Sequence, residues 1–256
     1  MIASEVQSDR AREFAGTRFD AFDMDDAVAW VARRDVRSPF AYVVTPNVDH
    51  IVRLDRMPGE SEALTAYHDA DLSLCDSQVL RLLARVTGVT LPVVRGSDLT
   101  EQVIARALRP GARINFVGGD TAMADVLRRL MPGATLAHHA PPMGLLRDPA
   151  AMAAAVAFIE DNAADVTFLA VGSPQQELIA HRARGGGKAH GTALCVGAAI
   201  EFVTGLKARA PMWMRNAGLE WLHRLLTEPR RLWRRYLVED LQIFPIVWRW
   251  VRTRKS

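Results

Sequence analysis

Short apolar runs alternate with amphipathic segments over most of the chain, and this alternation constrains the fold more than any other feature. Six runs have the length and content of strands, at residues 41–45, 71–75, 113–118, 135–139, 166–172 and 192–197. Segments with helical periodicity lie between them, among them 77–86, 97–108, 121–130 and 149–159. Strands and helices that alternate at this spacing predict an α/β fold, with an open, mostly parallel, Rossmann-like sheet covered by helices on both faces.

The charge of the chain changes sign near residue 207. From Lys207 onward there are 12 Lys and Arg against 4 Asp and Glu, and five of the six Trp lie there. The preceding 206 residues carry a net charge of −5. We therefore expect an α/β core over residues 1–206 and a helical, basic and aromatic appendage over residues 207–256.

Several classes of protein are disfavoured. The first sixteen residues contain no apolar stretch and no small-residue cleavage site, so we expect no secretory signal and a cytoplasmic protein. No window approaches the roughly 18 to 20 apolar residues of a spanning helix, so membrane contact should be peripheral. Cys75 and Cys195 each lie in an apolar run, which predicts buried thiols with neither a disulfide nor a zinc site.

Polar residues follow the first two apolar runs. Thr45 ends the first, Asn47 lies two residues beyond it, and Asp76 directly follows the second. In parallel sheets ligands bind beyond the carboxyl ends of the strands, where a carboxylate is placed to act as a general base. Asn47 and Asp76 also suit the N-cap of a helix, so the structural and the catalytic interpretations both stay open.

Two glycine turns follow later runs and precede helices. Glycine lets the backbone turn sharply near a ligand, and the free N–H groups of a helix N-terminus suit phosphate oxygens. Neither turn matches the dinucleotide fingerprint or the P-loop, which disfavours NAD and ATP chemistry but leaves a nucleotide diphosphate open. The residues concerned are Gly118, Gly119, Gly172, Ser173 and Pro174, with Gln176 and Glu177 in the following helix.

Two pairs of aspartates have the D-x-D spacing that often holds a divalent cation. One pair lies in Asp23–Asp26, where acidic side chains suit the first turn of a helix. The other, Asp69 and Asp71, precedes a strand and should lie at the far edge of the sheet. We therefore favour structural roles for both pairs and expect no metal site.

Taken together, the motifs resemble the WecG/TagA/CpsF family of bacterial glycosyltransferases (glycosyltransferase family 26). The resemblance runs from about residue 40 to about residue 237, and it is specific because the last two motifs are long and unusual. The matching residues are Thr45-x-Asn47, Asp76, Arg95-x-x-Asp98-Leu99, Gly118-Gly119, Gly172-Ser173-Pro174-x-Gln176-Glu177, Gly197, Arg209-Ala210-Pro211, Gly218-Leu219-Glu220-Trp221 with Arg224, and Glu228-Pro229-x-Arg231.

The resemblance implies an inverting, metal-independent enzyme without a cofactor. It would move a sugar from a UDP-sugar, for example UDP-ManNAc, UDP-ManNAcA, UDP-glucose or UDP-glucuronate, onto a polyprenyl-diphosphate-linked saccharide in the synthesis of bacterial surface polysaccharides. The core would hold the donor and acceptor sites. The appendage would bind the anionic inner face of the cell membrane and cover the active site. The resemblance also allows a homo-oligomer.

By similarity, Asp76 is the catalytic base, and Thr45 and Asn47 line the same pocket. The donor and its diphosphate would contact both glycine turns, with Gln176, Glu177 and three arginines of the appendage. Arg95 and Asp98 would lie on the acceptor side. The three arginines are Arg224, Arg231 and Arg234, whose offsets of seven and three predict one helix face.

Three positions depart from the family pattern, and one of them is Glu201, which stands where an Asp is common. Ser77 replaces a common Gly, and Gln175 replaces a common Lys, which bears on donor choice.

A nucleotide-dependent oxidoreductase would share the α/β body, but the sequence lacks the glycine fingerprint of that class. A nucleic-acid-binding protein would explain the Arg and Trp mixture but not Asp76, so we expect no nucleic-acid partner.

Overall fold

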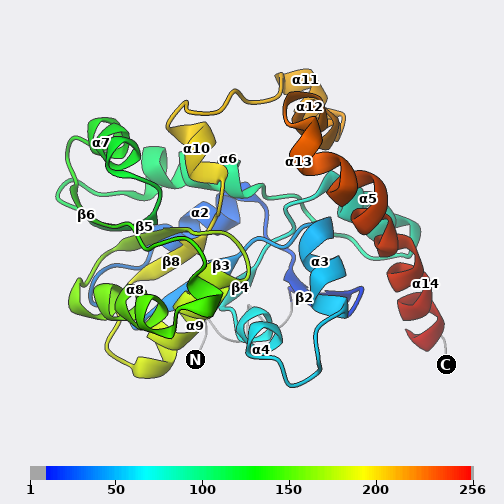
Figure 1. The fold of residues 1–256 in the computed structure, drawn as a ribbon, viewed down its shortest axis with the longest axis horizontal. Coiled ribbons are helices and arrows are strands. Elements are labelled where there is room, and N and C mark those ends of the chain that lie inside the picture. The colour runs from blue at the N-terminus through cyan, green and yellow to red at the C-terminus, as the bar shows by residue number, and fades with distance from the viewer. Residues whose placement is uncertain (1–9, 255–256) are drawn as a thin grey trace.

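The computed structural model describes residues 10–254 and has the predicted α/β architecture (Figure 1). Its centre is a six-stranded sheet in which every strand pairs in parallel, in the order β4-β3-β8-β7-β5-β6. All six predicted strands are confirmed. They are β3 (Ala41–Val44), β4 (Leu72–Ser73), β5 (Arg113–Gly118), β6 (Thr135–His139), β7 (Val166–Ala170) and β8 (Thr192–Cys195).

Helices cover both faces of this sheet because alternate strand residues point to opposite sides. Val43, Phe168 and Leu194 pack on one face against a first group of helices. This group is α2 (Met24–Ala32), α6 (Gly96–Gln102) with the π-helical turn η1 (Val103–Ala107), α7 (Thr121–Leu130) and α10 (Ala199–Val203). The predicted helix over 97–108 therefore exists, but its last turn is π-helical.

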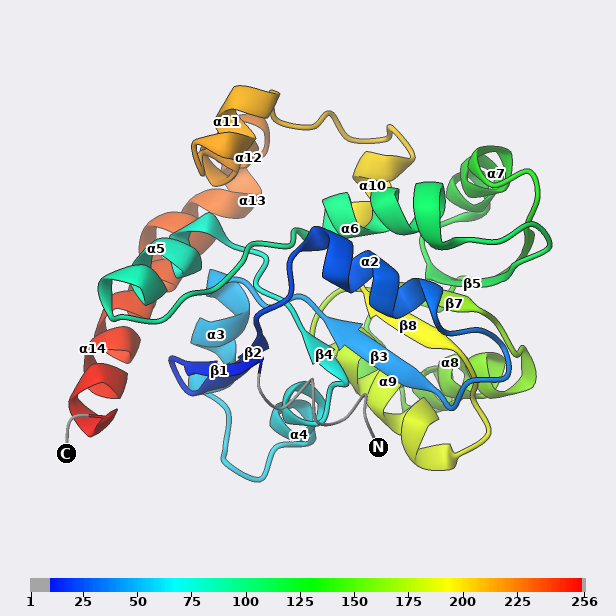
Figure 2. The ribbon, with the colours of Figure 1, turned by 180° about the vertical axis from the view of Figure 1, so that it is seen from behind.

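The neighbouring strand residues pack on the other face. Tyr42, Leu169 and Cys195 are buried there against α4 (Glu62–His68), α8 (Pro149–Asp161) and α9 (Gln175–Gly186), and a short 3-10 turn, η2 (Leu145–Arg147), precedes α8. Figure 2 shows α2 and α6 on the opposite side of the sheet from α8 and α9. Both layers of helix on sheet are therefore complete before the chain reaches residue 207.

A third apolar cluster lies beside the β4 edge of the sheet, and the sequence analysis did not predict its first element. This is an antiparallel hairpin, β1 (Ala11–Phe14) and β2 (Thr17–Asp20), whose turn residues Ala15 and Gly16 both have positive φ. Phe14 and Phe19 are fully buried. They pack with α3 (Val48–Asp55), α5 (Gln78–Val86) and the C-terminal helix α14 (Ile243–Arg254).

The C-terminal segment leaves the body after α10, crosses over the carboxyl edge of the sheet and returns to the hairpin (Figure 1). It consists of α11 (Met212–Asn216), α12 (Glu220–Thr227), α13 (Pro229–Arg234), the π-helical turn η3 (Arg235–Glu239), the 3-10 turn η4 (Asp240–Gln242) and α14. Ile243, Ile246 and Val247 of α14 are buried in the third cluster. Within the described part of the chain, none of the helices has the length and apolar content needed to span a membrane.

Candidate active site

A cavity of about 800 Å³ opens at the carboxyl ends of four adjacent strands, β4, β3, β8 and β7. Its floor is made by residues that directly follow those strands, such as Thr45, Asp76, Gly172 and Gly197. The C-terminal segment makes the opposite wall. Six arginines and four carboxylates line the cavity, so its charge is mixed with an excess of cations: Arg53, Arg95, Arg215, Arg224, Arg231 and Arg235, and Asp49, Asp76, Glu220 and Asp240.

Asp76 lies in the cavity and does not cap α5, the helix that follows it. The helix α5 that follows it is capped by Ser77, whose hydroxyl accepts from Leu80 N at 3.2 Å. Ser77 has φ −156°, so a glycine is not required there. Burial raises the pKa of Asp76 to about 7, and the like charge of Glu220 adds to this shift. The Gly96 N–H and two arginines act in the opposite direction.

Thr45 and Asn47 both line the cavity, but Asn47 is also a structural residue. Its side chain accepts from His50 N at 3.3 Å, and its own N–H faces His50 Nδ1 at 3.4 Å, which forms a capping box at the start of α3. The Thr45 hydroxyl donates to the Cys195 carbonyl at 3.3 Å. Gly96 packs closely here, since a Cβ on it would lie 3.2 Å from Thr45 Oγ1.

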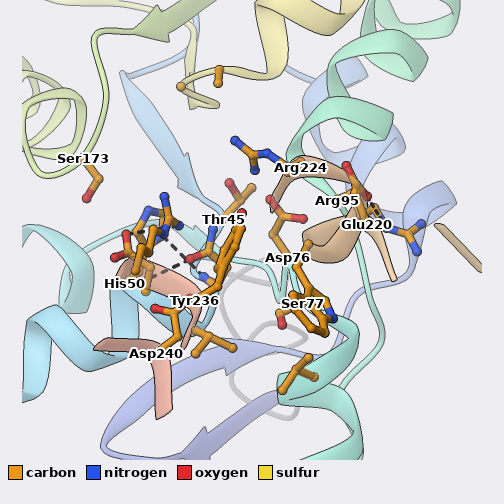
Figure 3. Close-up of a pocket in the computed structure, with 18 of the residues that line it drawn as sticks. Thr45, His50, Asp76, Ser77, Arg95, Ser173, Glu220, Arg224, Tyr236 and Asp240 are labelled. Atoms are coloured by element: carbon orange, nitrogen blue, oxygen red, sulfur yellow. Dashed lines mark hydrogen bonds and ion pairs between the residues drawn. The ribbon is translucent and has the colours of Figure 1, made fainter. Parts of the chain in front are cut away.

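The Gly172–Ser173 turn lies on the other side of the cavity from Asp76 (Figure 3). Gln176 is 3% exposed, lines the cavity, and has a side-chain oxygen with no hydrogen-bond partner in the described structure. Glu177 is fully buried behind it and accepts from Gln176 Nε2 at 2.8 Å. Burial raises the pKa of Glu177. Gln176 can therefore reach a ligand, whereas Glu177 acts on the cavity only through its neighbours.

Pro174 immediately precedes α9 and is outside the cavity lining, as is Gln175. Tyr67 holds the turn in place through a hydrogen bond, since its hydroxyl lies 2.8 Å from Ser173 Oγ. The turn thus presents the backbone and hydroxyl of Ser173 to the cavity.

Arg95 and Asp98, the predicted acceptor-side pair, belong to one polar network, and of the two only Arg95 lines the cavity. Asp98 Oδ2 accepts from Arg95 Nη1 at 3.2 Å, and its other oxygen pairs with Arg209 and Arg215. Arg95 also lies 3.5 Å from Glu220 Oε2. Asp98 therefore braces the C-terminal segment against α6 instead of facing the cavity.

The C-terminal arginines do not share the single helix face that their spacing predicts. Arg224 and Arg231 line the cavity, but Arg234 points away and pairs with Glu239 at 3.2 Å. The helix breaks between α12 and α13 at Glu228, which has φ −129° and ψ 57°, so the offset of seven residues crosses a change of direction. Arg235, in the following π-helical turn, lines the cavity in the place predicted for Arg234.

Gly118 and Gly119, predicted to contact the donor, lie outside the cavity lining. Gly118 is the last residue of β5 and Gly119 follows it, and β5 is separated from β3 by β8 and β7 in the sheet order. Gly118 has φ +119°, and a Cβ there would lie 2.6 Å from the Ala170 carbonyl oxygen. The glycines serve the close packing of β5 on β7 and the turn into α7.

The paired aspartates occupy structural positions away from the cavity. Asp23 caps α2 by accepting from Asp26 N at 2.9 Å, and Asp26 pairs with Arg10 at 2.5 Å. Asp71 accepts from Tyr42 N at 2.9 Å and pairs with Arg184. Among residues 10–254, no three His, Cys, Asp or Glu side chains come together in an arrangement that could hold a metal ion.

Several cavity residues were not predicted as site residues, notably His50, Arg53, Glu220, Arg235 and Asp240. Arg53 lies in α3, the helix that follows Asn47, and it donates to the Ser173 carbonyl at 2.9 Å. The helical spacing of Asp49 and Arg53 was a signal that could have revealed them. Arg235 and Asp240 gave no such signal, because they reach the cavity only through the irregular turns η3 and η4.

The comparison with known families agrees with this geometry. The family model described as "Glycosyl transferase WecG/TagA/CpsF family" matches residues 12–256, nearly the whole chain. The match includes the hairpin and α14, which lie outside the residues that carried the resemblance in the sequence. The chain therefore belongs to the WecG/TagA/CpsF family of glycosyl transferases.

Proposed function

We propose that the protein transfers a sugar from a UDP-sugar to a polyprenyl-diphosphate-linked saccharide, with inversion at the anomeric carbon, in the synthesis of bacterial surface polysaccharide. Asp76 is the general base. The observation that carries this proposal is the position of Asp76: its carboxyl group lies in the main cavity at the sheet edge, and Ser77 caps the helix in its place.

Inversion requires the acceptor hydroxyl to attack from the face opposite the leaving diphosphate. One carboxylate on the attacking side must then remove the hydroxyl proton. Asp76 and the Gly172–Ser173 turn lie on opposite sides of the cavity, which fits a sugar held between them (Figure 3). A pKa of about 7 suits this role, since the carboxylate is populated near neutral pH and still holds a proton well once it has taken one.

The leaving diphosphate gains negative charge as the glycosidic bond breaks. Fixed guanidinium groups stabilise such charge because they donate pairs of hydrogen bonds to phosphate oxygens. Six arginines line the cavity, and four of them, Arg215, Arg224, Arg231 and Arg235, come from the C-terminal segment. We therefore propose that arginines, and not a bound cation, neutralise the leaving group.

A transfer assay tests this proposal directly. The purified full-length protein is incubated with a panel of UDP-sugars and a short-chain polyprenyl-diphosphate saccharide, with EDTA present, and the product and its anomeric configuration are determined by mass spectrometry and NMR. We expect transfer from one donor with inversion. Retention of configuration would exclude Asp76 as a base of this kind, and transfer that requires added Mn²⁺ would overturn the metal-free mechanism.

We also propose peripheral binding to an anionic membrane through the C-terminal segment. Leu237, Leu241, Phe244 and Trp248 are each at least half exposed on η3, η4 and α14. Arg249, Arg252 and Arg254 follow these side chains in the last turns of α14. Aromatic side chains at headgroup depth combined with cations are the composition of a helix that lies in a lipid interface.

Sedimentation with vesicles tests the membrane proposal. We expect binding to phosphatidylglycerol vesicles that weakens with salt and little binding to phosphatidylcholine. The double variant Phe244→Ser, Trp248→Ala should lose most of this binding. Met143→Ser is the matched control, because Met143 is equally apolar and 99% exposed but lies in the loop before α8. Equal loss in the control, or none in the double variant, would overturn the proposal.

A further inference from the structure

Glu177, in the first turn of α9, is a carboxyl group enclosed behind the cavity wall. Its side chain is fully buried, and no ion pair joins it to a cation among residues 10–254. Its Oε1 atom accepts from Gln176 Nε2 at 2.8 Å, whereas its Oε2 atom is buried and has no hydrogen-bond partner within the described residues. A buried carboxylate without a cation is costly, so such a group takes up a proton instead. Burial accordingly raises the pKa of Glu177.

Two hydroxyl groups lie next to this carboxyl group and lead from it to the cavity. The Tyr67 hydroxyl, from α4, lies 2.8 Å from Ser173 Oγ, and both hydroxyls are close enough to Glu177 to affect its pKa. Tyr67 is 5% exposed, and burial raises its pKa well above the ordinary value, so its hydroxyl keeps its proton. Ser173 lines the cavity across from Asp76 (Figure 3). Glu177 and Tyr67 therefore form the inner end of a polar chain that reaches the cavity at Ser173.

The protonation of Glu177 decides which way the hydrogen bonds of this chain run. The heavy atoms alone leave the direction open, since either Tyr67 or Ser173 can donate to the other. A charged carboxylate only accepts, so it would draw the hydroxyl protons towards itself and leave Ser173 with only lone pairs for the cavity. A protonated Glu177 donates from Oε2, because Oε1 already accepts from Gln176. Each hydroxyl then donates onward, and Ser173 Oγ donates into the cavity.

Three other titratable or charged groups face this chain, from α3 and β8. Burial raises the pKa of Cys195, in β8, well above its ordinary value, so the thiol is neutral. The imidazole of His50, whose ring centroid lies 5.9 Å from that of Tyr67, is also neutral near pH 7, since burial lowers its pKa to about 3. Arg53 donates to the Ser173 carbonyl at 2.9 Å. These groups do not change charge near neutral pH, which leaves the direction of the chain to Glu177.

We infer that Glu177 is a positioning residue whose protonated carboxyl group directs the Tyr67 and Ser173 hydroxyls, so that Ser173 donates a hydrogen bond to an oxygen of the bound ligand. That this ligand is the UDP-sugar rests on the proposed function. Glu177 itself touches no ligand, because Gln176 and Ser173 lie between it and the cavity. Its part is to keep one hydroxyl of the turn a donor.

Infrared spectroscopy of the full chain in D₂O tests the proton on Glu177 without any ligand. A protonated carboxyl group has a C=O stretching band apart from those of carboxylates. At about pH 8.5, Asp76 and Asp240 are charged, because their pKa values are about 7 and about 6. We expect a protonated carboxyl band to remain there and to disappear in Glu177→Gln. Glu62→Gln is the matched control and should keep the band, because hydrogen bonds from Arg182 lower the pKa of Glu62.

Titration with UDP by calorimetry tests the direction of the chain. The conservative variant Glu177→Gln keeps an acceptor for Gln176 and a neutral donor for the hydroxyls, so its affinity should stay within about threefold of the unaltered protein. Glu177→Met removes both and should weaken binding by about tenfold or more, the usual effect of losing a hydrogen bond to a charged group. Ser173→Ala should weaken binding as much. Adding Glu177→Met to Ser173→Ala should then change the affinity by less than about twofold, since the chain no longer has an end.

A second variant interrupts the chain in the middle and keeps the packing of the ring. Tyr67→Phe should weaken UDP binding by about threefold or more, because it separates Glu177 from Ser173. Tyr42→Phe is the matched control: Tyr42 is fully buried, its hydroxyl donates to the Ala66 carbonyl at 2.6 Å, and it lies outside the cavity lining. Thermal unfolding of each variant shows that the protein titrated is folded.

Three results would overturn the inference. The first is a spectrum at about pH 8.5 without the protonated band, or with a band that persists in Glu177→Gln. The second is a Glu177→Met effect of full size in the Ser173→Ala background, which would mean that Glu177 acts through Gln176. The third is equal UDP affinity in Tyr67→Phe and Tyr42→Phe. A protein that passes all three tests but transfers no sugar would keep the inference and reject the proposed function.

Discussion

The behaviour of Asp76 with pH follows from its surroundings. A carboxyl group can take a proton from an alcohol only in its charged form, and the pKa of Asp76 is raised to about 7. We expect kcat/KM to rise with pH up to about 7 and then to level off. Initial rates of transfer between pH 5.5 and 8.5 measure this.

Asp76→Asn should lower kcat by about 10² to 10⁴ and abolish the rising limb of that profile. The control is Asp240→Asn, because Asp240 also has a raised pKa, of about 6, and lies in the same cavity. Its rising limb should stay near pH 7. If the rising part of the pH profile disappears in Asp240→Asn and persists in Asp76→Asn, then Asp240 and not Asp76 is the base.

The same raised pKa has a consequence for stability. The folded state favours the protonated form of Asp76, so its contribution is fully present below the unfolded pKa of about 3.8 and is lost as pH rises through about 7. Asp76→Asn should therefore unfold at a higher temperature than the unaltered protein at pH 8 and at nearly the same temperature at pH 4. Calorimetry at both values checks this, and an Asn variant less stable at pH 8 would contradict it.

At this scale, the sequence placed Asp76, Thr45 and Asn47 at the carboxyl edge of the sheet because they end or closely follow apolar runs with the content of strands, and all three line the cavity. It could not separate Gln176 from Glu177. These neighbours look alike in sequence, but only the backbone of α9 decides that one faces the cavity and the other lies buried behind it. Arg234 and Arg235 were exchanged for the same reason, since a break at Glu228 and a π-helical turn change the helical register.

At the scale of elements, the close contact between β5 and β7 depends on Gly118. Its φ of +119° is unfavourable for other residues, and a Cβ would lie 2.6 Å from the Ala170 oxygen. Gly118→Ala should lower the free energy of unfolding by about 3 kcal/mol or more, since it combines backbone strain with overpacking. Urea denaturation measures this loss.

The matched control is Gly111→Ala, which also has positive φ but open space around its Cβ position. It should lose only about 1 kcal/mol, the strain without the clash. The rate per folded molecule should be unchanged in both variants, because neither glycine lines the cavity. A Gly118→Ala enzyme that is stable but fails to bind UDP would return Gly118 to the donor site.

The strands could be predicted because parallel strands buried on both faces leave continuous apolar runs. The β1–β2 hairpin could not, because each strand has four residues and buries a single large side chain, Phe14 or Phe19. The helix α3 was expected after Asn47, and its capping box with His50 confirms the structural interpretation of Asn47. Its second role in the cavity wall becomes visible only when the C-terminal segment is in place.

At the scale of the whole molecule, the first strand, β1, packs against the last helix, α14. Trp250 of α14 packs edge-on against Phe14 with ring centroids 5.3 Å apart, and its Nε1 donates to Glu13 Oε1 at 3.1 Å. Composition revealed that residues 207–256 differ from the rest, but a contact between the first strand and the last helix leaves no local pattern. The division into two parts at residue 207 stays a prediction.

Trp250→Ala should lower the free energy of unfolding by about 1 to 3 kcal/mol, because it removes a half-buried aromatic contact and a hydrogen bond. Trp248→Ala is the control: Trp248 is 55% exposed on the same helix, and its removal should change stability by less than about 0.5 kcal/mol. Urea denaturation compares the two variants. Equal effects would mean that α14 does not depend on the hairpin for its place.

The order in which the cavity wall is encoded has a consequence for expression. A ribosome makes Asp76 and the Gly172–Ser173 turn well before Arg224, Arg231 and Arg235, which all follow β8. A nonsense codon between β8 and α11 therefore yields a polypeptide that keeps Asp76 and loses every arginine that the C-terminal segment contributes to the cavity wall. Under the proposed mechanism, synthesis must pass Arg235 before a molecule can transfer sugar, so chains that stop earlier would consume no nucleotide sugar.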